Sequence, residues 1–219
     1  MPIAGYIVAG FGGYLLGSIP TGFLVAQGRG IDIRALGSGN IGATNVFRHL
    51  GLPAGILVLL ADAAKGWLAV AVLARLVSGW FLTAAGPEPR EWLALCAGLS
   101  AILGHIYTCW LYFKGGKGIA TSAGVLVGLA PYALLIVLGL WLVVFALSRY
   151  VSLASLAAAF ALPFASWFTT RNSTLTAAMA AMTALAIYKH RTNIKRLLRG
   201  TENRIGGKKP PLPVAPPNS

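Results

Sequence analysis

Long apolar stretches separated by short basic loops are the feature that most restricts how this chain can fold. A helix needs roughly 20 predominantly apolar residues to cross the hydrocarbon core of a bilayer. Of the 219 residues, 57% are hydrophobic and 11% are charged, which is too little charge to cover a soluble domain. We therefore predict an all-α fold, a polytopic membrane helix bundle. Its seven predicted spans are residues 3–26, 52–77, 92–112, 119–130, 132–149, 151–168 and 173–189.

Pro131 separates the fourth stretch from the fifth, and a proline does not continue a helix cleanly. The two stretches could instead form one kinked span, which would lower the count to six. Seven transmembrane helices are favoured because they leave only Arg75, Arg90 and Arg171 on the outer side. The positive-inside rule then predicts the N-terminus out and the C-terminus in. The predicted inner side holds Arg29, Arg34, Arg48, Lys114, Lys117, Arg149, Lys189, Arg191, Lys195, Arg196, Arg199, Arg204, Lys208 and Lys209.

We expect one integral membrane domain over residues 1–205 and a disordered cytoplasmic tail over 206–219, where two lysines precede five prolines. The first basic residue, Arg29, follows the first apolar stretch, so that stretch is interpreted as a retained helix and not a cleaved signal peptide. The net charge of +13 lies in loops and tail, which favours anionic membrane lipids and phosphorylated substrates over nucleic acid. Cys96 and Cys109 have no metal-binding spacing, so no metal site is expected.

A loop rich in glycine and lysine spans residues 113–121, with the sequence Phe-Lys-Gly-Gly-Lys-Gly-Ile-Ala-Thr. Glycines let backbone N–H groups approach an anion closely, and the N-terminus of the apolar helix that follows adds partial positive charge. The spacing is not that of a nucleotide-binding P-loop. The loop therefore predicts a phosphate site at a membrane surface, with Lys117 as the ligand and Lys114 mainly as a membrane anchor.

Two further polar segments fall on the same predicted side. Residues 37–48 combine glycines with hydroxyl, amide and guanidinium groups that can hold phosphate, although an ordinary loop capping a helix at Thr44 or Asn45 would look similar. Residues 190–203 place His190 and Asn193 on one helix face. The basic residues of that segment, Arg196 and Arg199 among them, also fit a tail that binds lipid headgroups.

Several polar residues lie within the predicted spans. His105 is either a functional residue or a structural histidine with its hydrogen bonds satisfied, and the sequence leaves both open. Asp62 and Lys65 are three residues apart, which predicts an ion pair within one helix. Ser152 and Ser155 either pack helices together or face the site. A Ser-His-Asp set and a His-x4-Asp motif are both absent from the sequence.

Taken together, the three segments, Gly104-His105 and Asp62-x-x-Lys65-Gly66 resemble the bacterial acyl-phosphate:glycerol-3-phosphate acyltransferase family, from Gly17 to about Glu202. Ile41 and Thr108 stand where that family commonly has proline, which affects backbone stiffness and no reactive group. The resemblance implies transfer of a fatty acyl group from acyl phosphate to the sn-1 hydroxyl of glycerol 3-phosphate. The products would be lysophosphatidate and inorganic phosphate, in the first step of phospholipid synthesis.

The resemblance also implies a place and partners. The enzyme would be a multi-pass protein of the bacterial cytoplasmic (inner) membrane, with seven spans and an active site facing the cytoplasm. It would need no cofactor and no metal. Its partners would be acyl phosphate, glycerol 3-phosphate and anionic membrane lipids, and handover of the donor from an acyl-phosphate-forming enzyme is left open. The acyl tail would lie in an apolar groove between spans.

Site residues follow from the matching motifs. A substrate phosphate oxygen is the favoured proton acceptor, with a histidine, 190 or 105, as the alternative. We expect catalysis from Ser38, Arg48, Lys117, His190 and Asn193. We expect substrate binding by Gly39, Asn40, Gly42, Thr44, Asn45, Gly115, Gly116, Gly118, Thr121, His105, Ser152 and Glu202.

A different class of protein, a transporter of phosphorylated small molecules, would also need glycine-rich phosphate loops at a membrane. Transporters usually carry inverted repeats and a site at mid-membrane. Here no internal repeat is visible, and the polar segments share one predicted face, so an interfacial enzyme is favoured. A structural subunit that binds anionic lipid would explain the basic tail but not the three polar segments.

Overall fold

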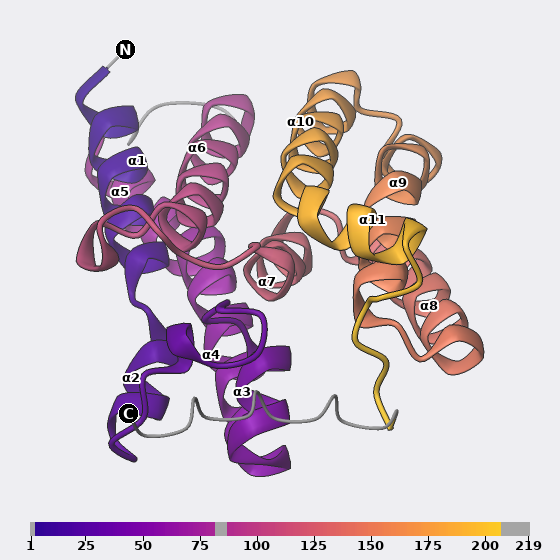
Figure 1. Ribbon diagram of the computed structural model, residues 1–219. Helices are drawn as coiled ribbons and strands as arrows, with labels where there is room; N and C mark the ends of the chain where they lie inside the picture. Colours follow the sequence, from indigo (N-terminus) through magenta and orange to yellow (C-terminus); the bar gives the residue numbers. More distant parts are fainter. Residues whose placement is uncertain (1–2, 82–86, 207–219) are drawn as a thin grey trace, which may run out of the picture.

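The computed structural model describes residues 3–81 and 87–206, and these residues form helices joined by loops (Figure 1). The all-α prediction is therefore confirmed for the described part of the chain. The predicted disordered tail lies, from residue 207 onward, outside the described residues. The α-helices are α1 Ile3–Ser18, α2 Thr21–Gln27, α3 Ala43–Leu50, α4 Leu52–Leu68, α5 Ala74–Phe81, α6 Pro87–Ile106, α7 Ile119–Leu129, α8 Pro131–Ser148, α9 Val151–Thr170, α10 Ser173–Lys189 and α11 Arg191–Leu198. Short 3-10 turns occur at Ile33–Ala35 and Cys109–Leu111, and a π-helical turn at Ala69–Leu73 joins α4 to α5.

Each predicted apolar stretch contains a helix, but not every helix is long enough to cross a bilayer. Within the described residues, five segments are long and apolar enough: Ile3–Gln27, Leu52–Phe81, Arg90–Leu111, Pro131–Ser148 and Val151–Thr170. At 1.5 Å per residue, the 11 residues of α7 extend about 16 Å and the 17 residues of α10 about 25 Å. The predicted count of seven therefore depends on α7 and α10.

Pro131 ends one helix and begins another, as the sequence predicts. The residue before it, Ala130, has φ −151° and ψ 64°, which is not helical. Pro131 then occupies the first turn of α8, where its missing N–H costs no hydrogen bond. Figure 1 shows α7 and α8 running in different directions, so they are two helices and not one kinked span.

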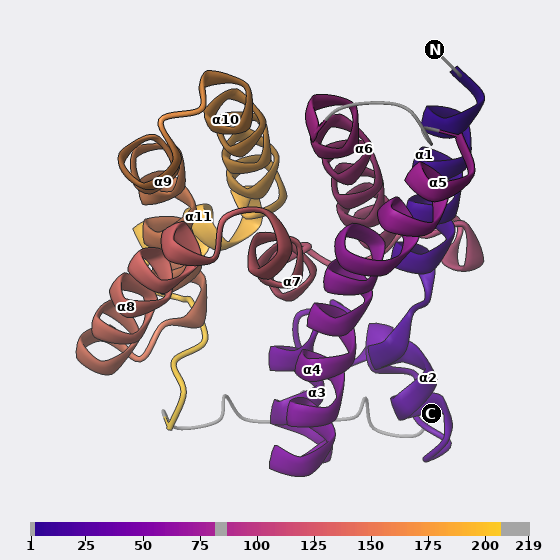
Figure 2. The same cartoon turned by 180° about the vertical axis from the view of Figure 1, so that it is seen from behind.

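The helices of the bundle form two groups, one of α1, α4, α5 and α6 and the other of α8, α9 and α10 (Figures 1 and 2). In the first group α1 lies along α6 so closely that a Cβ at Gly13 or Gly17 would meet the backbone of Ala97 or Ala101. Helix α7 packs on α4 and also contacts α8, so it joins the two groups. A single buried cluster, which includes Leu126 of α7, continues across this junction into α9 and α10.

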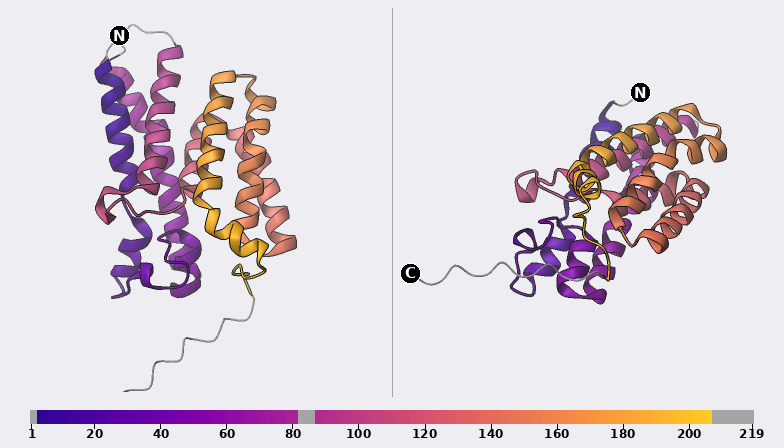
Figure 3. Two further views of the ribbon diagram at one scale, coloured as in Figure 1. Left: turned by 45° about the horizontal axis from the view of Figure 1, so that its top comes forward. Right: turned by 45° about the vertical axis from the view of Figure 1, so that its right-hand side comes forward.

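Three short helices, α2, α3 and α11, lie at one end of the bundle. Figure 3 shows α2, α3 and α11 together at the end opposite the N-terminus. The three polar segments of the sequence supply α3, the loop before α7, and α11 with the residues that follow it. Sequence-distant polar segments therefore meet at one end of an otherwise apolar bundle.

Candidate active site

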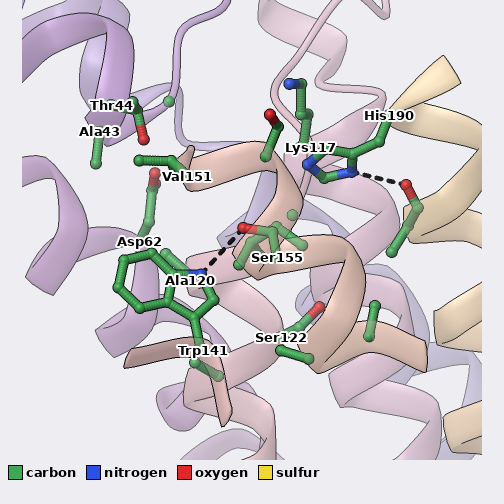
Figure 4. Close-up of a pocket in the computed structure, with 18 of the residues that line it drawn as sticks. Ala43, Thr44, Asp62, Lys117, Ala120, Ser122, Trp141, Val151, Ser155 and His190 are labelled. Atoms are coloured by element: carbon green, nitrogen blue, oxygen red, sulfur yellow. Dashed lines mark hydrogen bonds between the residues drawn. The ribbon is translucent and has the colours of Figure 1, made fainter. Parts of the chain in front are cut away.

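One cavity of about 340 Å³ is bordered by all three polar segments and by α7, α8, α9 and α10 (Figure 4). Its wall has a polar part, here called the polar mouth, and an apolar part that extends between the helices, here called the apolar arm. Every predicted catalytic residue lines the polar mouth: Ser38, Arg48, Lys117, His190 and Asn193. The predicted binding residues on the same wall are Asn40, Gly42, Thr44, Asn45, Gly118, His105, Ser152 and Glu202. Those away from it are Gly39, Gly115, Gly116 and Thr121.

The glycines of the 113–121 loop divide into two kinds. The N–H groups of Gly115 and Gly116 donate to the carbonyls of Ile106 and His105, at 3.1 and 3.0 Å, so they are used in folding the loop onto the end of α6. Gly118 reaches the cavity and precedes α7 with φ +83°, a conformation that favours glycine. The loop therefore presents its last glycine to the cavity and uses the others to position it.

Two more of the predicted binding residues, Gly39 and Thr121, do not line the cavity. The N–H of Gly39 donates to the carbonyl of Leu36 at 2.9 Å, and Gly39 has φ +68°, so it turns the first polar loop. Thr121 is fully buried in α7, and its carbonyl lies where a side chain at Gly66 of α4 would go. In this structure both residues shape the walls around the cavity and do not face it.

Asn45 organises the first polar loop. Its side chain is 2% exposed, and its amide nitrogen donates to the carbonyls of Ile33, Leu36 and Asn40 at 3.2, 3.0 and 2.9 Å. Its amide oxygen accepts from the backbone N–H of Ser38 at 3.2 Å. Because the amide is fully used within the protein, Asn45 fixes the loop and holds Ser38 at the mouth.

Helices α3, α7, α9 and α11 all begin at the polar mouth. The first turns that line it include Ala43 and Thr44 of α3, Ala120 of α7 and Val151 of α9, which surround the cavity in Figure 4. The first N–H groups of a helix have no partner within that helix, and the end carries partial positive charge. Several such ends meeting at one cavity favour an anion such as phosphate there.

Glu202 connects the charged side chains of the mouth. Its carboxylate accepts from Asn193 Nδ2 at 2.8 Å, Ser152 Oγ at 3.0 Å and Arg196 Nε at 2.7 Å, and its side chain is 4% exposed. Lys117 Nζ in turn donates to Asn193 Oδ1. Glu202, near the end of the third segment, thus holds groups from α9 and α11 together and, through Asn193, the lysine of the loop before α7.

The cations of the mouth are partly desolvated. Burial lowers the pKa of Lys117 to about 8, against the attraction of Glu202, which raises it. Burial likewise lowers the pKa of Arg48, yet an arginine starts so high that it stays charged. Although burial pushes the pKa of Glu202 upward, hydrogen bonds from Arg196, Asn193 and Ser152 outweigh this and hold it below its usual value. At neutral pH the mouth therefore carries charged cations whose attraction to an anion is strengthened by low exposure to water.

His190 is neutral in this setting. Its Nδ1 lies 2.8 Å from the carbonyl oxygen of Ala186, the dashed contact in Figure 4, so Nδ1 carries the proton and Nε2 is left to accept. Burial and the charge of Lys117 lower the pKa of His190 to about 4. A group with so low a pKa is a weak base at neutral pH. The arrangement suits a hydrogen-bond acceptor that orients a hydroxyl better than it suits a proton acceptor.

The predicted ion pair of Asp62 and Lys65 is present, with 2.9 Å between Nζ and Oδ1, and it belongs to a larger buried cluster. Thr21 Oγ1 donates to Asp62, and His105 Nδ1 lies 3.5 Å from the same carboxylate. Lys65 also donates to the carbonyl of Ile19 at 3.0 Å. The cluster joins α2, α4 and α6 beside the mouth, and His105 lines the cavity next to the Asp62 carboxylate, although its Nδ1 has no hydrogen-bond partner among the described residues.

Arg196 corrects the sequence interpretation. It was expected to bind lipid headgroups from the tail, but it lines the cavity and forms a 2.7 Å ion pair with Glu202. The spacing could have indicated this, because Arg196 lies three residues after Asn193 and six after His190, close to one helix face.

Ser155, whose role the sequence leaves open, also lines the cavity and accepts a hydrogen bond from Trp141 Nε1 at 3.2 Å.

The apolar arm continues from the mouth between α7, α8, α9 and α10. Its lining includes Leu126, Val137, Leu162 and Met182, one from each of these helices. A cavity with an anion-binding end and an apolar extension matches a ligand with an anionic head and an apolar tail.

Comparison with known proteins gives a consistent match. Residues 7–200 match the family model described as glycerol-3-phosphate acyltransferase. A relative of that name from Geotalea daltonii is 46% identical over 197 residues, which cover 90% of this chain and 96% of the relative. One from Geobacter sulfurreducens is 48% identical over 192 residues, covering 88% and 93%.

Solved structures agree with the sequence relatives. The chain is similar to the crystal structure of PlsY (YgiH), an integral membrane glycerol 3-phosphate acyltransferase, in its glycerol 3-phosphate form, with a TM-score of 0.80 and 38% identity over 91% of this chain and 94% of that one. The lysophosphatidic acid form of that enzyme gives a TM-score of 0.78 with 37% identity, covering the same shares.

Proposed function

The chain belongs to the glycerol-3-phosphate acyltransferase family, and from that premise we propose that it moves a fatty acyl group from an acyl phosphate to the sn-1 hydroxyl of glycerol 3-phosphate. The products are lysophosphatidate and inorganic phosphate. The observation that carries the proposal is one cavity in which a mouth lined by cations and helix N-termini continues into an apolar arm. An acyl phosphate has this shape, with a phosphate head and an apolar tail.

Both substrates carry phosphate, so two anions must bind side by side. Arg48 and Lys117, with Ser38, hold phosphate oxygens, and the free N–H groups at the starts of α3 and α7 complete two cradles. His190 and Asn193 orient the acyl carbonyl or the attacking hydroxyl. The desolvated cations support this assignment, because their attraction for phosphate is least screened where the exposure is lowest.

The reaction needs little beyond positioning and charge stabilisation. The glycerol hydroxyl oxygen attacks the acyl carbonyl carbon, the bond from that carbon to the bridging phosphate oxygen breaks, and phosphate leaves with the electron pair. Phosphate is a good leaving group, so holding the two reactants and stabilising the developing charge supply most of the rate. The hydroxyl proton passes to a substrate phosphate oxygen. The low pKa of His190 supports this choice over a histidine base.

We also propose the topology that the charge pattern predicts. Seven spans, with α7 and α10 as the two short ones, put the N-terminus outside the cell and the C-terminus inside. The polar mouth then faces the cytoplasm of a bacterium across its inner membrane, where a soluble acceptor and a donor handed over by an acyl-phosphate-forming enzyme can reach it. Labelling of a cysteine added to the tail, in a Cys96→Ala/Cys109→Ala background, checks the topology. Labelling only from the outer face of sealed vesicles would contradict it.

Phosphate release by the purified protein tests the reaction. With dodecanoyl phosphate, release should require glycerol 3-phosphate and should equal lysophosphatidate formation mole for mole. Release without the acceptor would instead indicate a phosphatase. Absence of release, together with uptake of glycerol 3-phosphate into proteoliposomes, would replace the acyltransferase with a transporter.

A further inference from the structure

The apolar arm follows one face of α9. Ser155, Ala158 and Leu162 line it, and their spacing of three and four residues puts them on one side of the helix. Ser152 marks the polar mouth at the start of the same helix. The ten-residue step from Ser152 to Leu162 corresponds to about 15 Å at 1.5 Å per residue.

The far end of the arm is closed. Leu162 is 5% exposed and Met182 of α10 is 6% exposed, and both belong to a buried cluster with Met179, which is fully buried. Close-packed side chains of this kind leave no room for a chain to pass between them. A tail that enters the arm from the mouth therefore stops at Leu162 and Met182.

The cavity is open at its side. Leu59 of α4 and Leu138 of α8 also line it, yet they are 47% and 44% exposed, so part of the wall is continuous with the lipid-facing surface. A lipid-soluble donor can enter there without crossing water. A tail can thus lie in either of two places, in the closed arm or out through this side, and the two give different chain-length behaviour.

Hydrophobicity cannot favour one length over another inside a membrane protein. The tail comes from the bilayer, whose interior is as apolar as the leucines of the arm, so burial gains little free energy. What remains is space: a tail longer than the arm must bend or displace packed side chains, and overpacking of that kind is unfavourable. Length selection then depends on where the arm ends.

We propose that the tail lies in the closed arm and that α9 sets the upper limit of its length, with Ala158 keeping the arm open and Leu162 closing it. The inference rests on the proposed function and deepens it by naming what selects the donor. An extended chain advances about 1.3 Å per methylene, the projection of a carbon–carbon bond of about 1.5 Å. The four-residue step from Ala158 to Leu162 is about 6 Å. A bulky side chain at position 158 therefore shortens the limit by about four or five carbons.

Chain-length profiles test the inference. The full chain in lipid nanodiscs is given acyl phosphates of increasing length, and kcat/KM is measured from acceptor-dependent phosphate release. The arm of about 15 Å holds about twelve carbons, so in Ala158→Leu the ratio of kcat/KM for dodecanoyl to octanoyl phosphate should fall about tenfold or more, the size of an overpacking penalty. Leu162→Ala should move the profile the other way and raise the ratio of kcat/KM for tetradecanoyl to octanoyl phosphate.

Ala157 provides the matched control. It does not line the cavity, and it lies on the face of α9 that carries the exposed residues Leu153 and Phe160. Ala157→Leu makes the same change in size one residue away and should leave the profile as in the wild type. Equal losses at every length in Ala158→Leu, or no change in either profile, would overturn the inference and favour a tail that leaves through the side. Failure of the wild type with every acyl phosphate would instead overturn the donor assignment, and the inference with it.

Discussion

The polar mouth and the apolar arm belong to one cavity but are built in different ways. The mouth is held by directional bonds: Glu202 alone accepts from three side chains, and helix N-termini converge beside it. The arm is held by packing of leucine, valine, alanine and methionine, with the hydrogen bond from Trp141 to Ser155 near its start. A directional network fails when one atom is lost, whereas a packed wall changes only its volume.

This difference predicts that the mouth controls the rate of the reaction and that the arm controls which acyl donors are accepted. Changes in the mouth should reduce the rate for every donor, because they remove charge from the transition state. Changes in the arm should re-rank donors and leave the chemistry in place. The predictions below test that separation, beginning with the mouth.

Lys117→Ala should have the largest effect, a loss of activity of about a thousandfold or more, since it removes a partly buried cation from the proposed phosphate site. Acceptor-dependent phosphate release measures it. Lys114→Ala is the matched control in the same loop, because Lys114 is exposed and does not line the cavity. Near-normal turnover in Lys117→Ala, or an equal loss in Lys114→Ala, would remove the phosphate-site assignment.

Arg196→Ala should lower kcat/KM by about a hundredfold, because it removes one cation of the mouth and leaves Glu202 without its ion pair. Arg199→Ala changes the same residue type one turn further along, at an exposed position outside the cavity wall, and should stay within about twofold. The same steady-state assay on both variants checks this. Similar losses for the two would restore the interpretation of Arg196 as a headgroup-binding residue.

The pH profile should show an alkaline limb. In the proposed site Lys117 holds phosphate while it is protonated, so kcat/KM should fall about tenfold per pH unit once the pH rises above about 8. Lys117→Arg should move that limb upward, since arginine keeps its proton. A limb that stays in place in Lys117→Arg would assign it to another group.

The acid side of the same profile tests His190. With its pKa near 4, His190 should not titrate between pH 5 and 7, so any limb there should persist in His190→Gln. It should persist in His105→Gln as well, because the proposed proton acceptor is a substrate phosphate oxygen. A limb near neutral pH that disappears in either variant would make that histidine the base and contradict the substrate phosphate.

Ser155→Ala should have the smallest effect. It removes the acceptor for Trp141 Nε1 near the start of the arm, which costs about 1 kcal/mol of stability. Activity with octanoyl phosphate should change by less than about threefold, and the thermal midpoint should fall by a few degrees. A loss as large as that of Arg196→Ala would mean that the arm takes part in the chemistry, which would break the comparison.

Some features of this protein followed from local sequence. Apolar runs located the helices, because a span needs continuous apolar residues, and Pro131 predicted the break between α7 and α8. The spacing of Asp62 and Lys65 predicted their ion pair. The polar segments identified the residues that could bind phosphate, since glycine, hydroxyl and cationic groups stand out in an apolar chain.

Tertiary structure alone decided which of those residues face the cavity. Lys117 meets Asn193 across 76 residues of sequence, and Arg48 reaches the carbonyl of Asn203 across 155. Such contacts depend on how each helix is rotated and how deeply it sits, which packing against neighbours determines and local pattern does not. For the same reason, the sequence pattern placed Arg196 with residues that bind lipid headgroups. The length of the apolar arm likewise depends on how α9 packs against its neighbours. The sequence by itself determined the helices and the kinds of group available, and packing decided where each group points.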